Sequence, residues 1–200
     1  MKRIIIILLI LVFLLPVCAG AESTVNVDGV DFTIPQKYSG GELTDSCYML
    51  NNAYTFRILS LASEKNLKLN FGYDSSSDDV LDIRESYVGG HNAVVIYSNK
   101  TICEHEVVSI YYACGDKIFV VSYNGSEFTP EIEKMIENTP ESSISGETLY
   151  NTLADAQLEY VYDLEQEENE IELENAIDNA LEKHQSQHSR FFIFYHKSYT

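Results

Sequence analysis

The stretch that decides the fold runs from His91 to Asn138 and reads HNAVVIYSNKTICEHEVVSIYYACGDKIFVVSYNGSEFTPEIEKMIEN. Val, Ile, Tyr and Phe, which favour half-buried strands, dominate three runs in it: Ala93–Ser98, Glu106–Ala113 and Lys117–Tyr123. Short turns at positions 98–101 and at Gly115-Asp116 join these runs. The stretch therefore predicts three successive strands that are neighbours in one sheet.

A helix is predicted directly after these strands. Thr129 is a suitable N-cap, and Pro130 suits the first helical position because its missing N–H has no partner there. Ile132, Met135 and Ile136 recur at helical spacing and predict one apolar stripe.

Upstream, two hairpins are predicted from turn residues between apolar runs. The first turns at Asp28-Gly29, a strong hairpin signal, and the second at Asn51-Asn52. The four strands expected are Val25–Val27, Val30–Ile34, Cys47–Leu50 and Tyr54–Ser60.

The segment between the hairpins and His91 is predicted from periodicity. Apolar and polar residues alternate strictly over Leu67–Tyr73, which predicts a strand with one polar face. The polar run Asp74–Asp79 predicts the start of a short helix that carries Val80, Leu81, Ile83 and Arg84.

The last quarter of the chain is strongly acidic. Residues 147–183 have approximate helical spacing of Leu, Val and Ile and predict two helices, interrupted by the like-charge run Glu165–Glu170. The tail from His184, with its apolar run Phe191–Tyr195, is expected to be either a strand or disordered.

This order of elements predicts an α+β fold. We expect a largely antiparallel sheet of about six to eight strands with helices packed on it, because strands in immediate succession disfavour a doubly wound parallel sheet. The expected domain covers residues 22–140, and an acidic helical extension covers residues 147–200.

The N-terminus has the features of a secretory signal. Lys2 and Arg3 precede the apolar run Ile4–Leu15, Pro16 breaks it, and Ala19–Ala21 suits cleavage after Ala21. The protein is therefore expected to be secreted or at the cell surface, outside the cytoplasm.

Two alternatives to cleavage remain open. Residues 4–21 are nearly long enough to stay as a membrane anchor, which would be the chain's only membrane contact. Cys18 could instead be lipidated, although Val17 makes the preceding residues a poor lipidation motif.

Export makes a disulfide plausible among the three cysteines of the mature chain, Cys47, Cys103 and Cys114. Cys103 and Cys114 flank one predicted strand and lie about 35 Å apart if it is continuous, so they should not pair with each other. A bridge from Cys47 to one of them is one expectation, and three free cysteines are the other.

Charge excludes some classes of partner. The net charge is −18, which argues against binding to nucleic acid or to anionic membrane surfaces. Fourteen acidic residues and no Lys or Arg lie between Met135 and Glu182, so that segment is expected to be a solvated surface or to dock against the sheet or another chain.

The chain resembles the PsbP-like α/β/α sandwich over about residues 24–138. The residues that carry the resemblance are DFTIP at 31–35, Gly89-Gly90 before a strand, and GSEFTPE at 125–131 before a helix. Residues 27–35 are also similar to the V-D-G-x-x-F-x-I-P opening of small secreted proteins of methanogenic archaea. The resemblance implies a binding or assembly module rather than an enzyme, and the acidic extension lies outside it.

One segment has the ligand order of a calcium-binding EF-hand. In DSSSDDVLDIRE, oxygen donors fall at positions 1, 3, 5, 9 and 12, which are Asp74, Ser76, Asp78, Asp82 and Glu85. Asp79 opposes this hypothesis because it stands where the turn needs glycine, and a strand rather than a helix is predicted before it. The alternative is an N-cap by Ser77 or Asp78 at the start of the short helix.

Two sequons for N-linked glycans lie in predicted turns. They are Asn99-Lys-Thr101 and Asn124-Gly-Ser126, and in an exported chain both asparagines are candidate acceptors.

No catalytic motif is present: there is no G-x-S-x-G, no phosphate-binding loop and no protease-type cysteine motif. An exported hydrolase assembled in space near His91, Cys114 or Asp116 remains an alternative.

Two further groups of polar residues are candidates for a site. His184 and His188 have the spacing of metal ligands, but no third ligand is nearby. Glu104 and Glu106 share one face of a strand, and His105 points away from that face.

We therefore expect a non-catalytic, exported binding or assembly module whose ligand is a protein or another cell-surface component. No cofactor is expected apart from calcium at Asp74–Glu85. Tyr97, Tyr111, Tyr112 and Tyr123 are expected on a sheet face that is either a binding surface or partly exposed sheet.

Overall fold

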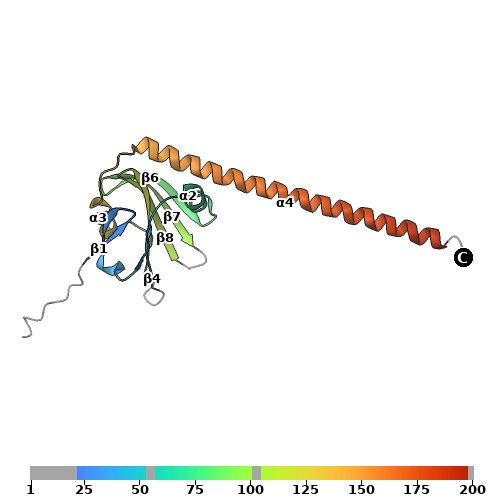
Figure 1. The fold of residues 1–200 in the computed structure, drawn as a ribbon, viewed down its shortest axis with the longest axis horizontal. Helices are drawn as coiled ribbons and strands as arrows, with labels where there is room; N and C mark the ends of the chain where they lie inside the picture. The colour runs from blue at the N-terminus through green and yellow to red at the C-terminus, as the bar shows by residue number, and fades with distance from the viewer. Residues whose placement is uncertain (1–21, 53–56, 101–104, 198–200) are drawn as a thin grey trace, which may run out of the picture. The chain divides into compact units, whose positions relative to one another are not determined.

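The computed structural model describes residues 22–52, 57–100 and 105–197, with the side chains of Arg57, Lys100 and residues 180–197 outside the description. The described chain is α+β, with a seven-stranded antiparallel sheet, a separate two-stranded sheet and three α-helices (Figure 1). The predicted fold class is confirmed.

The described residues fall into two compact units. The first unit contains the chain up to Asn66 and Ser77–Thr152, and the second contains Leu67–Ser76 and the chain from Leu153 onward. In chain order the elements are β1 (Ser23–Val27), β2 (Val30–Ile34), the 3₁₀ turn η1 (Gln36–Tyr38), β3 (Glu42–Leu43), β4 (Cys47–Asn52), β5 (Arg57–Ser63), α2 (Leu67–Ser76), β6 (Val80–Val88), β7 (His91–Lys100), β8 (His105–Cys114), β9 (Lys117–Asn124), α3 (Pro130–Glu137) and α4 (Gly146–Lys197).

The first hairpin, β1–β2, has the turn that its sequence predicts. Val27 pairs with Val30, so only Asp28 and Gly29 form the turn, and their φ angles are 49° and 86°. A two-residue turn with positive φ at both positions matches the right-handed twist of the strands. The prediction from Asp28-Gly29 is confirmed.

The seven strands of the large sheet lie in the order β3-β4-β5-β9-β8-β7-β6. The three predicted strands of the His91–Asn138 stretch are β7, β8 and β9, paired as antiparallel neighbours. The turn predicted at positions 98–101 is wrong in part, because β7 continues through Lys100 and pairs Asn99 with Glu106.

The main core of the first unit lies between one face of this sheet and the layer formed by β1, β2 and α3 (Figure 1). One row of side chains crosses this face from β4 to β6: Tyr48, Leu61, Val121, Ile110, Val95 and Arg84. The neighbouring row is Leu50, Leu59, Tyr123, Val108, Tyr97 and Asp82. Both rows are apolar until they end in a charged residue on β6, the edge strand of the sheet.

The strand predicted over Leu67–Tyr73 is wrong, because these residues form helix α2. The physical reason lies within the second unit. A Cβ atom at Gly72 would lie 2.4 Å from Tyr160 Cβ, so α2 and α4 approach closely at a position that only glycine permits. Gln157 also donates a hydrogen bond to Ser75 O at 3.2 Å, and Lys68 pairs with Asp163. Contacts with a segment far along the chain therefore override the local alternation.

The short helix predicted from Asp74 onward is wrong as well, because Val80–Val88 is strand β6. These two errors are of opposite kind and cancel in the strand count, and the two-residue strand β3 is one that the sequence does not predict. The charged residues that favoured a helix here are typical of an edge strand, whose outer side faces water.

Helix α4 runs without interruption from Gly146 to Lys197, so the break predicted at Glu165–Glu170 is wrong. Ser145 caps its start, since its hydroxyl accepts a hydrogen bond from Thr148 N at 3.1 Å. No Gly or Pro lies between Glu147 and Lys197, so nothing in the backbone interrupts the helix despite the repulsion between its carboxylates.

Candidate functional site

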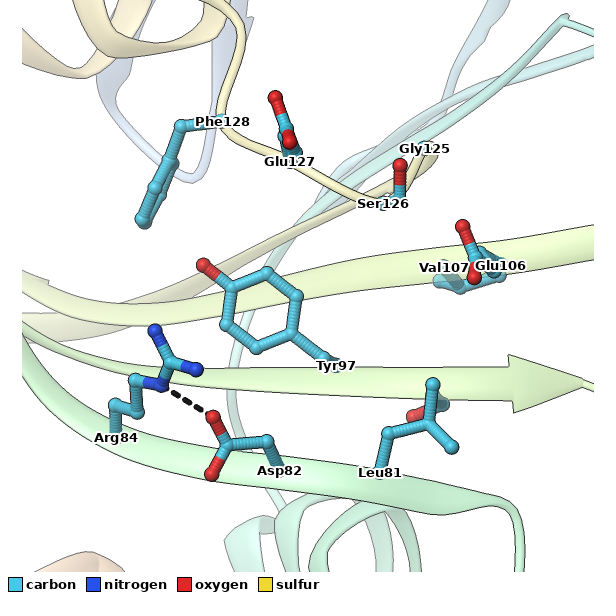
Figure 2. Close-up of a pocket in the computed structure, with 11 residues that line it drawn as sticks. Leu81, Asp82, Arg84, Tyr97, Glu106, Val107, Gly125, Ser126, Glu127 and Phe128 are labelled. Carbon is cyan, nitrogen blue, oxygen red and sulfur yellow. Dashed lines mark hydrogen bonds and ion pairs between the residues drawn. The ribbon is translucent and has the colours of Figure 1, made fainter.

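The most distinctive hollow in the first unit lies where the core face of the sheet reaches β6 (Figure 2). It has a volume of about 490 Å³ and is open to solvent. We call it the Tyr97 groove, and it is lined by Leu81, Asp82, Arg84, Tyr97, Ser98, Glu106, Val107, Gly125, Ser126, Glu127 and Phe128.

Tyr97 organises the floor of the groove. The Phe128 ring meets it edge-on, with ring centroids 6.4 Å apart and an interplanar angle of 84°. The Arg84 guanidinium lies 5.4 Å from the Tyr97 ring centroid and pairs with Asp82 (Figure 2). The edge-on contact and the cation–π contact are both favourable geometries, so the ring is held between two neighbours.

The loop Gly125–Phe128 forms the opposite wall and is fixed to the sheet at two points. Gly125 N donates to Glu106 O at 2.9 Å, and the Tyr123 hydroxyl donates to Glu127 O at 3.0 Å. Tyr123 is fully buried, and burial raises the pKa of its phenol well above the usual range, so the hydroxyl stays protonated and keeps this hydrogen bond. The wall is therefore preformed, as most ligand sites are.

The groove has an excess of negative charge. Asp82 is compensated by Arg84, but Glu106 and Glu127 have no basic side chain within ion-pair distance among the residues that the structure describes. In Figure 2 both carboxylates are on the far side of Tyr97 from Arg84. The lining thus combines aromatic surface with two uncompensated carboxylates.

The groove adjoins an open strand edge. Within the first unit, β7 is the only strand that pairs with β6, and a register shift separates Val80 from Asp82 on it. The Tyr150 hydroxyl is 3.5 Å from Ser86 O, near the far end of the strand. The outer edge next to the groove therefore presents unpaired backbone groups.

A second hollow of about 460 Å³ lies beside α3 and is lined in part by Pro35, Lys37, Pro130 and Lys134. Its Lys37 pairs with Glu131 at 3.4 Å. The hydrogen bond from the backbone N–H at Glu131, and then the charge of Lys37, lower the pKa of the Glu131 carboxyl. It has neither the aromatic floor nor the strand edge of the Tyr97 groove.

His91 and Cys114, candidates for a hydrolase site, belong to a buried cluster rather than to an open one. His91 Nδ1 is 2.9 Å from Ala113 O, and because a carbonyl only accepts, Nδ1 carries a proton. His91 Nε2 is 3.3 Å from Thr139 Oγ1, which also donates to Ile136 O at 2.6 Å. The ring therefore joins β8 to the end of α3.

Cys114 lies in the same region and is 1% exposed. Burial raises the pKa of its thiol, with a smaller opposing effect of Thr139 and of Lys117. A protonated, inaccessible thiol is a poor nucleophile. Asp116 is exposed in the turn between β8 and β9, and Glu104 lies outside the described residues.

A bridge between Cys47 and Cys114 does not fit the sheet. Cys47 is on β4 and Cys114 on β8, with β5 and β9 between them, so three strand spacings of about 4.8 Å separate the two. This exceeds the reach of a disulfide, and both cysteines are free. That part of the prediction is wrong, while Cys103 lies outside the described residues.

The five residues of the predicted calcium loop are not in one loop. Asp74 and Ser76 are on α2, Asp78 is in the following turn, and Asp82 and Glu85 are on β6. Because β6 is in regular register from Asp82 to Glu85, these two side chains face opposite sides of the sheet. The described part of the chain contains no group of three or more His, Cys, Asp or Glu placed to hold a metal ion, and the helix–loop–helix that an EF-hand needs is not what this segment forms.

The remaining candidates have different positions from those expected. Asn99 is exposed near the end of β7, with Thr101 outside the described residues, and Asn124 is the last residue of β9. Both stay candidate glycan acceptors. His184 and His188 lie on α4, in the range whose side chains are not described.

Three of the four singled-out tyrosines, Tyr111, Tyr112 and Tyr123, are at most 1% exposed, so they are core and not a surface. Only Tyr97 reaches a hollow. No sequence pattern groups Tyr97 with Phe128 or with Arg84, for which the sequence predicts a helix. The sequence signal that could find the groove is the spacing of Asp82 and Arg84. They are two residues apart, so their side chains share one face of a strand.

Comparison of the chain with protein-family models, with curated proteins and with solved structures found no match. In the part of the chain that the structure describes, no helix combines the length and the apolar composition that crossing a membrane requires.

Proposed function

We propose that this chain is a non-catalytic, extracytoplasmic binding or assembly module and that the Tyr97 groove is its binding surface. The observation that carries the proposal is the meeting, in one open hollow, of an aromatic floor, two uncompensated carboxylates and a wall fixed by hydrogen bonds. Concave sites with apolar surface and a few placed polar groups are the usual form of a binding site.

Three further points support binding over catalysis. The candidate nucleophile Cys114 is buried with a raised pKa, and His91 is buried against backbone and hydroxyl partners. In the groove, Asp82 pairs with Arg84, and the lining contains no His to act as a base and no Cys to act as a nucleophile. The signal-like N-terminus and the PsbP-like resemblance both favour an exported module of this kind.

The proposal is tested by observing the groove directly. Backbone amide signals of the full chain would be followed by NMR while four probes are added separately: pools of cationic, anionic and apolar octapeptides, and a chito-oligosaccharide mixture. We expect at least one probe to shift the amides of Ser98, Ser126 and Phe128 more than those of α3.

A matched pair of variants makes the test specific. Phe128→Ala should remove the response to the active probe, whereas Tyr73→Ala, at an exposed aromatic of the second unit, should leave it unchanged. If no probe perturbs the groove amides, or if the perturbation survives in Phe128→Ala, the groove is not the binding surface.

A further inference from the structure

We propose that the Tyr97 groove and the outer edge of β6 together bind a cationic, extended peptide segment of a partner protein, which adds to the sheet as a further strand beside β6. This inference rests on the proposed function and assigns the class of ligand.

The backbone of β6 supplies the first part of the recognition. β6 is the edge strand of the large sheet, and within the first unit its outer side has no strand partner. An extended peptide that pairs with such an edge gains main-chain hydrogen bonds, while its alternate side chains occupy neighbouring pockets. Two backbone groups of β6 already have contacts outside the β6–β7 pairing: Val80 N donates to Ser77 O at 3.1 Å, and Ser86 O is 3.5 Å from the Tyr150 hydroxyl.

The two faces of β6 differ, and this difference predicts the pattern of the ligand. Asp82 and Arg84 face the groove, together with Tyr97. Ile83 and Tyr87 face the opposite side and are 38% and 70% exposed. A strand paired with β6 would place every second side chain beside the groove and the others beside Ile83 and Tyr87.

Charge selects the residues that suit the groove side. Asp82 is compensated by Arg84, so the net charge of the lining comes from Glu106 and Glu127. A Lys or Arg side chain that extends past Tyr97 would compensate these carboxylates, and its aliphatic stem would pack on the rings of Tyr97 and Phe128. On the other face, Ile83 and Tyr87 suit β-branched or aromatic partners. The ligand pattern is therefore alternating basic and apolar.

The test uses synthetic probes of defined pattern. Binding of the full chain to a labelled octapeptide of alternating Lys and Val would be measured by fluorescence anisotropy. Two probes are compared with it: alternating Glu and Val, and a block peptide with four Lys followed by four Val. We expect the alternating Lys/Val probe to bind at least about tenfold more tightly than either, and more weakly at high salt because groove carboxylates contribute.

Variants locate the binding. The double variant Glu106→Gln/Glu127→Gln should weaken binding of the Lys/Val probe by about three- to tenfold at low salt. The control Glu133→Gln/Glu137→Gln makes the same change of charge at exposed positions of α3 and should bind as the unmodified chain does. Circular dichroism and thermal melting of both variants verify that the fold is retained.

N-methylation tests addition as a strand. Two Lys/Val probes would be prepared, one methylated on every Lys amide and the other on every Val amide. In a strand beside β6 only one of these two sets of N–H groups faces the protein, so one isomer should lose binding and the other should keep it. If the peptide bound through its side chains alone, methylation would change the affinity of both isomers to the same extent.

The inference is overturned if the alternating and block probes bind equally, if the groove variant binds like the α3 control, or if the two methylated isomers behave alike. Each of these results leaves the proposed function standing if another probe still perturbs the groove amides. If no probe perturbs them, the proposed function fails together with the inference.

Discussion

Asp28 has two roles in the first turn, one of backbone geometry and one of charge. Its φ of 49° is uncommon for a residue with a side chain, although Asp and Asn tolerate it. Its carboxylate accepts a hydrogen bond from Ser63 Oγ at 2.7 Å and lies 3.2 Å from Lys117 Nζ. The hydrogen bond from Ser63, and then Lys117, hold the pKa of Asp28 below its usual value. The side chain therefore ties the hairpin to β5 and β9.

The lowered pKa predicts how the Asp28 contact depends on pH. Because the folded-state pKa is depressed, its stabilising contribution is full above the unfolded-state pKa, near 4, and is lost as pH falls through the folded-state value. Asp28→Asn keeps the turn but removes the charge. We expect its Tm to be below that of the unmodified chain at pH 7 and the difference to shrink at pH 3. A constant difference across this range would contradict the ionic role.

Tyr112 and Tyr123 are both buried, but they differ in whether the hydroxyl group makes a hydrogen bond. The Tyr112 hydroxyl has no hydrogen-bond partner among the described residues, whereas the Tyr123 hydroxyl donates to Glu127 O at 3.0 Å. Burial raises the pKa of Tyr112 far above its usual value, so it stays neutral. Its ring still packs 5.5 Å from the His91 ring and 6.3 Å from the Phe119 ring.

The same substitution should therefore have opposite effects at these two sites. Tyr112→Phe removes an unsatisfied polar group, so it should be neutral or raise the free energy of unfolding by about 1 kcal/mol. Tyr123→Phe removes a made hydrogen bond and should lower it by about 1 kcal/mol. Urea unfolding at pH 7 measures both. Equal destabilisation by the two variants would mean that Tyr112 has a polar partner after all.

At the scale of elements, α4 is a helix whose charges oppose its own conformation. Every described side chain from Tyr162 to Asn179 is exposed. Glu168 and Glu172 are four residues apart, as are Glu170 and Glu174, so like charges face each other along the helix. No Lys or Arg lies in this part of the helix to compensate them.

Reversing one of these charges should strengthen the helix locally. Glu172→Lys converts the repulsive pair with Glu168 into an attractive one in the favourable order, worth about 0.2–0.5 kcal/mol relative to no pair. Glu172→Gln only removes the repulsion and should have a smaller effect. Cα chemical shifts of residues 165–179 should therefore become more helical in the order unmodified, Gln, Lys. An order in which Gln equals Lys would show that no ion pair forms.

Local sequence signals predict some elements well and others badly, and the difference has a physical origin. Asp28-Gly29 and the Val-rich runs of β7, β8 and β9 define their elements through neighbouring residues. Leu67–Tyr73 has strand-like alternation but becomes α2, because Gly72 meets Tyr160, which is 88 positions further on. A contact between residues so far apart in the sequence leaves no pattern in the residues around either of them.

The same limit explains what could be predicted of the site. In the sequence, Tyr97 is distinguished by residue type alone, as are three tyrosines that belong to the core. The groove around it exists because two apolar rows of the sheet end at Asp82 and Arg84, and this follows from the pairing of β6 with β7. Because the local sequence predicts a helix where β6 lies, neither the shared face of Asp82 and Arg84 nor the open strand edge can be predicted from it.

For the molecule as a whole, the two units are not successive pieces of chain. Helix α2 lies between β5 and β6 in sequence but groups with the chain from Leu153 onward. The predicted extension from residue 147 therefore differs from the second unit, which recruits an internal segment and begins later. Composition reveals the change of charge along the chain, but it does not reveal which distant segments fold together.

The acidic composition of α4 also has a consequence for its resistance to proteolysis. Because the helix has no Lys or Arg before Lys183, a trypsin-like protease has no cleavage site between Lys134 and Lys183, even though the side chains from Tyr162 to Asn179 are exposed. Such an enzyme would release residues 135–183 as one intact fragment. The composition that weakens the helix electrostatically also protects it from one large class of secreted proteases, and leaves it open to those that cut after glutamate.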